Sequence, residues 1–179
     1  MKKLLLFSVV VLLSMRLFSQ QNIFTVGGGY SWANIESTDA NATGYRINAL
    51  YEFNPLEASV AHGAAISYLS ISATDGDLKS TISSLPVYYA PKIMLGNSDK
   101  FKVFINGALG MQFSWLKREG IVNLTDNDMG FYLGAGGGIM LYLKENVFLN
   151  AGYDFAWVTN SWYADGLLHS ATGGIGFRF

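Results

Sequence analysis

The segment 101–116, FKVFINGALGMQFSWL, alternates between two kinds of residue over its whole length. Bulky apolar residues, among them Phe101, Ile105 and Trp115, occupy one set of alternate positions, and mostly small or polar residues occupy the other. Because neighbouring side chains of a β-strand point to opposite faces, this period of two predicts a strand with one apolar face and one small, polar face. The segment is also much longer than a typical globular strand of about 5–6 residues. The fold therefore has to accommodate long strands with two unlike faces.

The same alternation recurs along the chain. It predicts eight strands, at 23–33, 44–53, 58–72, 80–95, 101–116, 129–143, 147–158 and 167–179. In the third strand, Leu69 and Ile71 fall among the small residues, and His62 falls among the bulky ones. In the fourth strand, Pro86 and Pro91 each remove a backbone hydrogen-bond donor, so we expect a bulge or another irregularity there.

The connections between these strands alternate in length. Tight turns are expected at 54–57, 96–100 and 144–146, and longer polar loops at 34–43, 73–79, 117–128 and 159–166. Short turns at one end and long loops at the other are typical of a transmembrane β-barrel. The long loops carry more Asp and Glu than Lys and Arg, which predicts an acidic rim. In the last loop we expect Trp162 and Tyr163 to be exposed, in the lipid headgroup region or against a surface ligand.

The two strand faces differ in size and charge in a way that places the apolar face outside. Charged residues make up only 14% of the chain, against about 25% in ordinary soluble domains. The interior of an eight-stranded barrel is only wide enough for side chains to fill it, which favours small residues inside. The charged residues within strands all share the small-residue face; they are Arg46, Glu52, Lys92, Lys102, Asp154 and Arg178. Since Arg or Lys facing lipid at the midplane costs about 2–4 kcal/mol, we expect this face to line the lumen.

Aromatic residues of the apolar face gather near strand ends. We assign to two belts at the membrane–water boundaries Phe24, Tyr30, Trp32, Tyr45, Tyr51, Phe53, Phe101, Trp115, Trp157, Phe177 and Phe179. Tyr and Trp suit such a boundary because each combines an apolar body with a polar tip.

The chain begins with two lysines, an apolar run and then small and polar residues, MKKLLLFSVVVLLSMRLFSQ. This pattern predicts a secretory signal peptide over 1–19 and a mature domain over 20–179. The rest of the chain offers no apolar run long enough for a spanning helix, which leaves a closed β-barrel as the way to span a membrane. The formal net charge of −1 provides no basic field for a nucleic acid. The absence of Cys excludes disulfides and thiol chemistry.

With these features the chain resembles the small OmpA/OmpX-like outer-membrane β-barrels and the wider outer membrane protein beta-barrel domain family. The resemblance implies an all-β fold, an eight-stranded antiparallel up-and-down transmembrane β-barrel with short periplasmic turns and longer extracellular loops. It implies an integral location in the bacterial outer membrane, contact with lipid and lipopolysaccharide, and insertion by the barrel-assembly machinery. Ile175, Phe177 and Phe179 resemble the terminal signal that this machinery reads. We expect a monomer.

The charges assigned to the lumen are expected to form two layers. Arg46 and Asp154 would interact at mid-depth, and Glu52 would meet some of the other three cations nearer the turns. In so narrow a lumen these groups would act as a plug; a small ion path is the alternative.

The adjacent residues His169 and Ser170 are the candidate for catalysis, because some outer-membrane barrels are lipid A deacylases that use a His and a Ser. Neighbouring strand residues point to opposite faces, which is poor geometry for a base and its nucleophile. We therefore expect no catalytic residue, no cofactor and no metal site. The expected function is a structural or surface-interaction role in the envelope through the extracellular loops. A narrow pore for small or hydrophobic molecules is the alternative, and a lipid A-modifying enzyme is a third.

Overall fold

The computed structural model describes residues 20–36, 41–55, 60–95, 98, 100–120 and 123–179. The expected signal peptide, 1–19, lies outside them, as do parts of the expected turns 54–57 and 96–100 and of the loops 34–43 and 117–128. The described strands are β1 (Gln20–Ile35), β2 (Asn41–Pro55), β3 (Val60–Asp75), β4 (Leu78–Tyr89), β5 (Lys92–Leu95), β6 (Phe101–Glu119), β7 (Leu124–Lys144), β8 (Val147–Val158) and β9 (Tyr163–Arg178). Within the described ranges no helix has the length and apolarity to cross a membrane.

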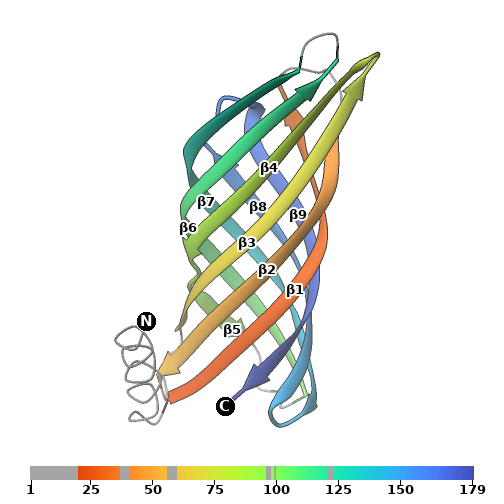
Figure 1. The fold of residues 1–179 in the computed structure, drawn as a ribbon. Coiled ribbons are helices and arrows are strands. Elements are labelled where there is room, and N and C mark those ends of the chain that lie inside the picture. Colours follow the sequence, from red (N-terminus) through yellow and green to blue (C-terminus); the bar gives the residue numbers. More distant parts are fainter. Residues whose placement is uncertain (1–19, 37–40, 56–59, 96–97, 99, 121–122) are drawn as a thin grey trace, which may run out of the picture.

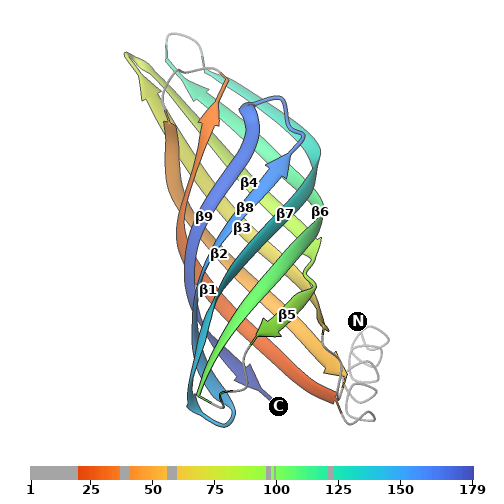
Figure 2. The same cartoon turned by 180° about the vertical axis from the view of Figure 1, so that it is seen from behind.

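These strands form one antiparallel sheet that closes on itself (Figures 1 and 2). Each strand pairs with its neighbours along the chain, and β9 returns to pair with β1. β4 and β5 share one position in the ring, because β5 continues β4 in the same register against both β3 and β6. The ring therefore has eight strands, and the predicted up-and-down barrel is confirmed.

The break between β4 and β5 lies at Ala90 and Pro91, where the sequence predicted an irregularity. The chain stays tied to both neighbours across the break, because the Ala90 N–H donates to β3 and the Pro91 carbonyl accepts from β6. Pro86 lies within β4, beside a gap in the β3–β4 pairing. Each proline thus removes hydrogen bonds locally without changing the register.

The strands extend further on the loop side than the alternation predicted. β3 and β4 meet in a tight turn in which Gly76 has a φ of 57°, a conformation that favours glycine. β6 and β7 stay paired up to Arg118 and Leu124. Much of the length expected as loop at 73–79 and 117–128 is therefore strand. Beyond the closed ring, β3, β4, β6 and β7 continue as a four-stranded extracellular sheet (Figure 1).

The apolar face points outward and the small-residue face inward, as predicted. Outward residues are bulky and exposed, as Leu109 (59%) and Phe131 (65%) illustrate. Inward glycines leave space for large side chains that lie along the barrel wall. A Cβ atom at Gly176 would lie 2.0 Å from the buried ring of Phe148. The alternation of large and small inward residues therefore fills the narrow interior.

The loop-side half of the lumen is closed by an apolar plug. Its buried members are Ala33, Ile35, Ala42, Leu69, Ile71, Ala73, Ile82, Ala108, Leu116, Tyr132, Ala156, Val158, Trp162, Tyr163 and Leu168. Leu69 and Ile71, which broke the pattern of the third strand, are inward members of this plug. The expected exposure of Trp162 and Tyr163 was wrong: both are buried, because the connection after β8 folds inward over the mouth of the barrel.

Gly176→Ala is expected to destabilise the barrel by about 1–3 kcal/mol, the usual cost of overpacking a tight interior. The Phe148 ring has no room to move, because it is 1% exposed and packs against Tyr142. Urea unfolding in lipid vesicles, followed by tryptophan fluorescence, measures the change. Gly173→Ala is the matched control on the same strand, since its Cβ would meet nothing closer than 3.6 Å. Equal stability of the two variants would contradict this account of the interior.

Candidate functional site

The inward side chains form three layers along the barrel axis. Going up β6 from the turn side, Phe104 comes first, then Asn106, and finally Leu116. Phe104 belongs to a small apolar cluster that also contains Ile23, Met140 and Phe148. Leu116 belongs to the apolar plug. The polar side chains between these two apolar layers are the candidate functional site.

Arg46 of β2 is the centre of the polar layer and is only 3% exposed. Its Nη2 donates to Tyr88 Oη at 2.7 Å and to Ser67 Oγ at 3.1 Å. Its Nη1 lies 3.4 Å from both Tyr132 Oη and Ser170 Oγ. These partners come from β3, β4, β7 and β9. Arg46 therefore links five strands across the lumen, and hydroxyl groups replace much of its water shell.

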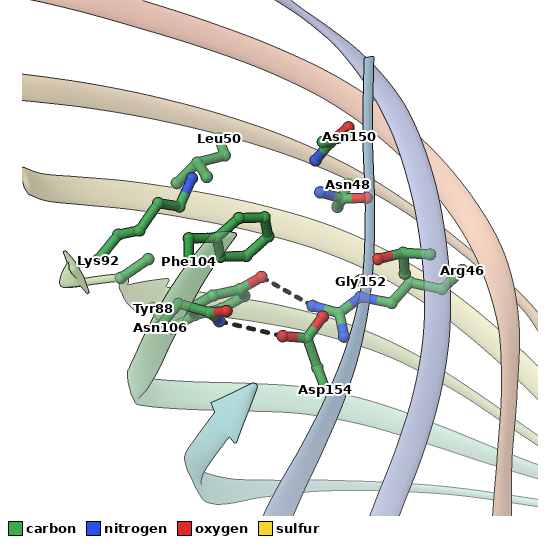
Figure 3. A pocket seen from close by; sticks show the side chains of 12 residues that line it. Arg46, Asn48, Leu50, Tyr88, Lys92, Phe104, Asn106, Asn150, Gly152 and Asp154 are labelled. Carbon is green, nitrogen blue, oxygen red and sulfur yellow. Dashed lines mark hydrogen bonds between the residues drawn. The ribbon is translucent and has the colours of Figure 1, made fainter. Parts of the chain in front are cut away.

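Asp154 of β8 lies in the same layer, but its hydrogen bond goes to an amide. Its Oδ1 accepts from Asn106 Nδ2 at 3.0 Å, and no ion pair joins Arg46 to Asp154 among the described residues. The two side chains instead line one cavity of about 50 Å³ (Figure 3). The buried Oδ1 atoms of Asn48 and Asn150, which also line it, have no protein partner. The cavity is large enough for a few water molecules.

Glu52 and Lys92 form a buried ion pair on the turn side of this cavity. Lys92 Nζ lies 2.8 Å from Glu52 Oε2, and the side chains are 6% and 0% exposed. Lys92 Nζ also lies 4.8 Å from the centroid of the Phe104 ring. Each ion compensates the other's lost hydration, so removing either one would leave a buried charge without a partner.

The two remaining lumen cations meet at Tyr142, near the turns. Arg178 Nη2 donates to Tyr142 Oη at 2.8 Å, and the guanidinium lies 4.9 Å from the ring centroid. Lys102 Nζ lies 5.7 Å from the same centroid. Of the three cations that we expected near Glu52, the structure brings only Lys92 into an ion pair with it.

Sequence reasoning missed a second polar cluster, inside the apolar plug. Gln112 Nε2, which has two N–H groups to donate, lies 3.1–3.3 Å from the hydroxyl oxygens of Ser84, Ser114 and Tyr163. It also missed Tyr88 and Tyr132 as partners of Arg46. The available signal was their position: each of these residues lies on an inward face otherwise rich in small residues.

His169 and Ser170 have separate partners on opposite sides of β9. Ser170 Oγ points inward and lies 2.8 Å from Ser31 Oγ. The His169 ring lies on the outward face, where its Nδ1 is 2.7 Å from Tyr153 Oη. The arrangement gives Ser170 no imidazole to accept its proton.

The aromatic residues assigned to the belts all lie on the outward face, and Trp32 and Tyr51 are half-buried there by their neighbours. At the end of the chain, Phe179 is 68% exposed and exchanges two backbone hydrogen bonds with Asn22 of β1. Ile175 and Phe177 point outward beside it. The proposed terminal signal thus lies along the seam that closes the barrel.

The extracellular end carries an exposed ion pair. Lys117 Nζ lies 2.6 Å from Glu119 Oε1, and this hydrogen bond, with the charge of Lys117, lowers the pKa of Glu119. Across the described residues, no group of three or more Asp, Glu or His is placed to hold a metal ion.

Comparison with known proteins agrees with this geometry. Residues 5–179 match the sequence model of a family described as outer membrane protein beta-barrel domain. No curated protein matches the chain. Neisserial surface protein A has a similar structure, with a TM-score of 0.67 and 12% identity over 88% of this chain and 97% of that one.

Two further solved structures have the same fold. One is Ail, the attachment invasion locus protein of Yersinia pestis, in complex with the heparin analogue sucrose octasulfate; its TM-score is 0.59 and its identity 17%, over 89% of this chain and 99% of that one. The other is a major outer membrane protein from Thermus thermophilus, with a TM-score of 0.62 and 10% identity over 90% and 100% of the two chains.

Lys92→Met is expected to lower the free energy of unfolding by about 3–5 kcal/mol, because Glu52 would remain buried without a counter-charge. Urea unfolding in vesicles measures the loss, and adding Glu52→Gln to the same chain should restore most of it. Lys117→Met breaks the exposed pair with Glu119 and should leave the unfolding midpoint unchanged. Equal losses in the two single variants would contradict the role given to the buried pair.

Proposed function

The chain belongs to the outer membrane protein beta-barrel domain family, and we propose that it acts at the cell surface, through its extracellular sheet, as a binding protein for extended polypeptides. It is an integral protein of the outer membrane. The lumen serves as a rigid, filled support, and the extracellular sheet carries the activity.

The free edge of β7 is the observation that carries this proposal. The pairing of β7 with β8 begins only at Tyr132, whereas its pairing with β6 continues to Leu124. Over 124–127, no described strand lies on the other side of β7. An edge of this kind presents backbone groups that no neighbouring strand pairs with, and an incoming extended chain can pair with them as an added strand. The Asn127 N–H donates to Asp126 Oδ1 at 2.8 Å and would exchange this side-chain partner for the incoming chain.

A groove of about 270 Å³ lies beside this edge and adds side-chain specificity. Leu116, Leu124 and Trp162 give it apolar walls, and Arg118 and Asp126 give it charge. Asp128 follows on the same strand, with its Oδ2 accepting from Asn160. Because the extracellular side carries more acidic than basic residues, an extended chain with apolar and basic side chains fits it best.

A sulfated sugar fits less well, although Ail was solved with a heparin analogue. On the outward face of the extracellular sheet, such a ligand would meet Lys79 and Lys117, and Lys117 is already paired with Glu119. The local charge therefore offers a polyanion little net attraction.

Binding of unfolded lysozyme to the protein in lipid nanodiscs tests the proposal. Reduced and carboxamidomethylated lysozyme is a basic, extended chain, whereas native lysozyme has similar charge but a folded backbone. We compare the full chain with a variant in which Asn-Gly replaces residues 117–125, called the hairpin-shortened variant. Leu116 and Asp126, which face each other in the β6–β7 pairing, then flank a two-residue turn. We expect the unfolded form to bind the full chain and the variant to lose at least about tenfold in affinity.

Asp77→Asn is the control, because it changes the charge of the turn between β3 and β4 and leaves the β7 edge intact. It should bind like the unaltered chain. Equal binding of native and unfolded lysozyme, or unchanged binding by the hairpin-shortened variant, would refute strand addition at β7.

The apolar plug disfavours the alternative of a narrow pore, since an ion entering it would lose its water among mainly apolar side chains, and the Gln112 cluster inside it is already hydrogen-bonded within itself. We expect no stable conductance steps from the protein in planar bilayers, under conditions in which a porin control conducts. Steady unitary conductance would contradict a closed lumen.

The separation of His169 from Ser170 disfavours the other alternative, a lipid A-modifying enzyme. Outward Ile175, Phe177 and Phe179 support their proposed role in insertion.

A further inference from the structure

The chain contains two His residues, and both lie on the outward face of the barrel. The ring of His169 on β9 stacks on Trp32 of β1, with centroids 5.6 Å apart and an interplanar angle of 15°. The ring of Tyr153 on β8 lies against both of these rings, with its centroid 6.2 Å from that of His169 and 6.0 Å from that of Trp32, and Tyr153 Oη lies 2.7 Å from His169 Nδ1. We call these three residues the upper triad.

The second histidine repeats this arrangement at the turn-side end. His62 on β3 stacks on Phe53 of β2 at 5.4 Å and on Tyr89 of β4 at 6.0 Å. Its Nδ1 is hydrogen-bonded to Tyr89 Oη. We call these residues the lower triad.

The two triads also share one register. In each, an aromatic residue stands directly opposite the histidine on one neighbouring strand, Trp32 opposite His169 and Phe53 opposite His62. On the other neighbouring strand, the tyrosine stands opposite the residue two positions beyond the histidine, Ala171 or Ala64. The same cross-strand construction therefore occurs once near each end of the outward face.

Counting hydrogen bonds assigns the proton on each imidazole. If the tyrosine O–H donates to Nδ1, the pair leaves a single free group, the Nε2–H donor. If Nδ1–H donated instead, the tyrosine hydrogen and the Nε2 lone pair would both be left without partners in an apolar surrounding, at greater cost. Nε2 has no partner among the described residues in either triad. Each triad thus presents one fixed N–H donor to whatever surrounds the barrel.

We propose that each triad is a lipid-binding site in which His Nε2–H donates to an acyl ester carbonyl, one site in each leaflet. Membrane lipids offer acceptors and few donors, so a donor held outward by the tyrosine matches them. Phosphate is the less suitable partner, because no Lys or Arg is in contact with the described rings of either triad and phosphate sites usually use such cations. The inference is independent of polypeptide binding at β7.

Nuclear magnetic resonance of ¹⁵N-histidine-labelled protein in nanodiscs, at mildly alkaline pH, tests the proposal. Two phosphatidylcholines of equal chain length are compared, one with ester-linked and one with ether-linked chains. We expect both rings to carry their proton on Nε2, and the Hε2 resonance to move upfield in the ether lipid, which has no carbonyl. Protonation at Nδ1, or the same Hε2 resonance in both lipids, would overturn the assignment; the second result would indicate water or phosphate as the acceptor.

The two tyrosines provide matched controls within one molecule. Tyr153→Phe keeps the ring and should abolish the tautomer preference and the lipid response of His169 only. Tyr89→Phe should do the same for His62 only. A response of both histidines to either change would contradict two separately built sites, and circular dichroism confirms that each variant retains its sheet.

Discussion

Backbone hydrogen bonding in a medium without water is the constraint on which the rest of this structure depends. Inside hydrocarbon, a strand needs a partner on each side, and the pairing of β1 with β9 supplies the last one. This closure ends where β7 leaves β8 at Tyr132 and β3 leaves β2 at Ser72. An unpaired edge is acceptable only beyond those points, where water can solvate it. The same rule therefore seals the barrel and leaves the two edges of the extracellular sheet, on β3 and β7, without a described partner strand.

Closure with eight strands leaves a narrow interior, and the inward residues follow from that space. Large side chains such as Phe148 lie over glycines, and Arg46 is surrounded by hydroxyl groups from four other strands. Charge is compensated locally, as with Glu52 and Lys92. Because the polar layer lies between two apolar layers, it stiffens the wall and is poorly placed to pass ions.

Alternation predicted the number of strands, their order and their inward and outward faces, because lipid and a narrow lumen both impose a period of two. It did not predict where the strands end, since outside the membrane polar residues such as Thr74 and Lys79 occupy the outward face and continue the sheet without an apolar signal. The alternation places Arg46 on the inward face of its strand. It does not give the depth of Arg46 relative to Asp154, because that depth depends on the stagger between strands. The inward position of Trp162 could not be predicted for a similar reason, because the residues of a connection do not alternate between two faces.

The strands of the extracellular sheet are the same strands that cross the membrane, with no flexible joint between the two parts. A force applied to the β6–β7 hairpin and directed along these strands would pull both strands together, and would therefore load the ladders that join β6 to β4 and β5 and β7 to β8. Many hydrogen bonds would then have to break together in shear, whereas a tether peeled from its end would lose them one at a time. An attachment made at this hairpin would be mechanically continuous with the wall and suited to holding a cell against flow.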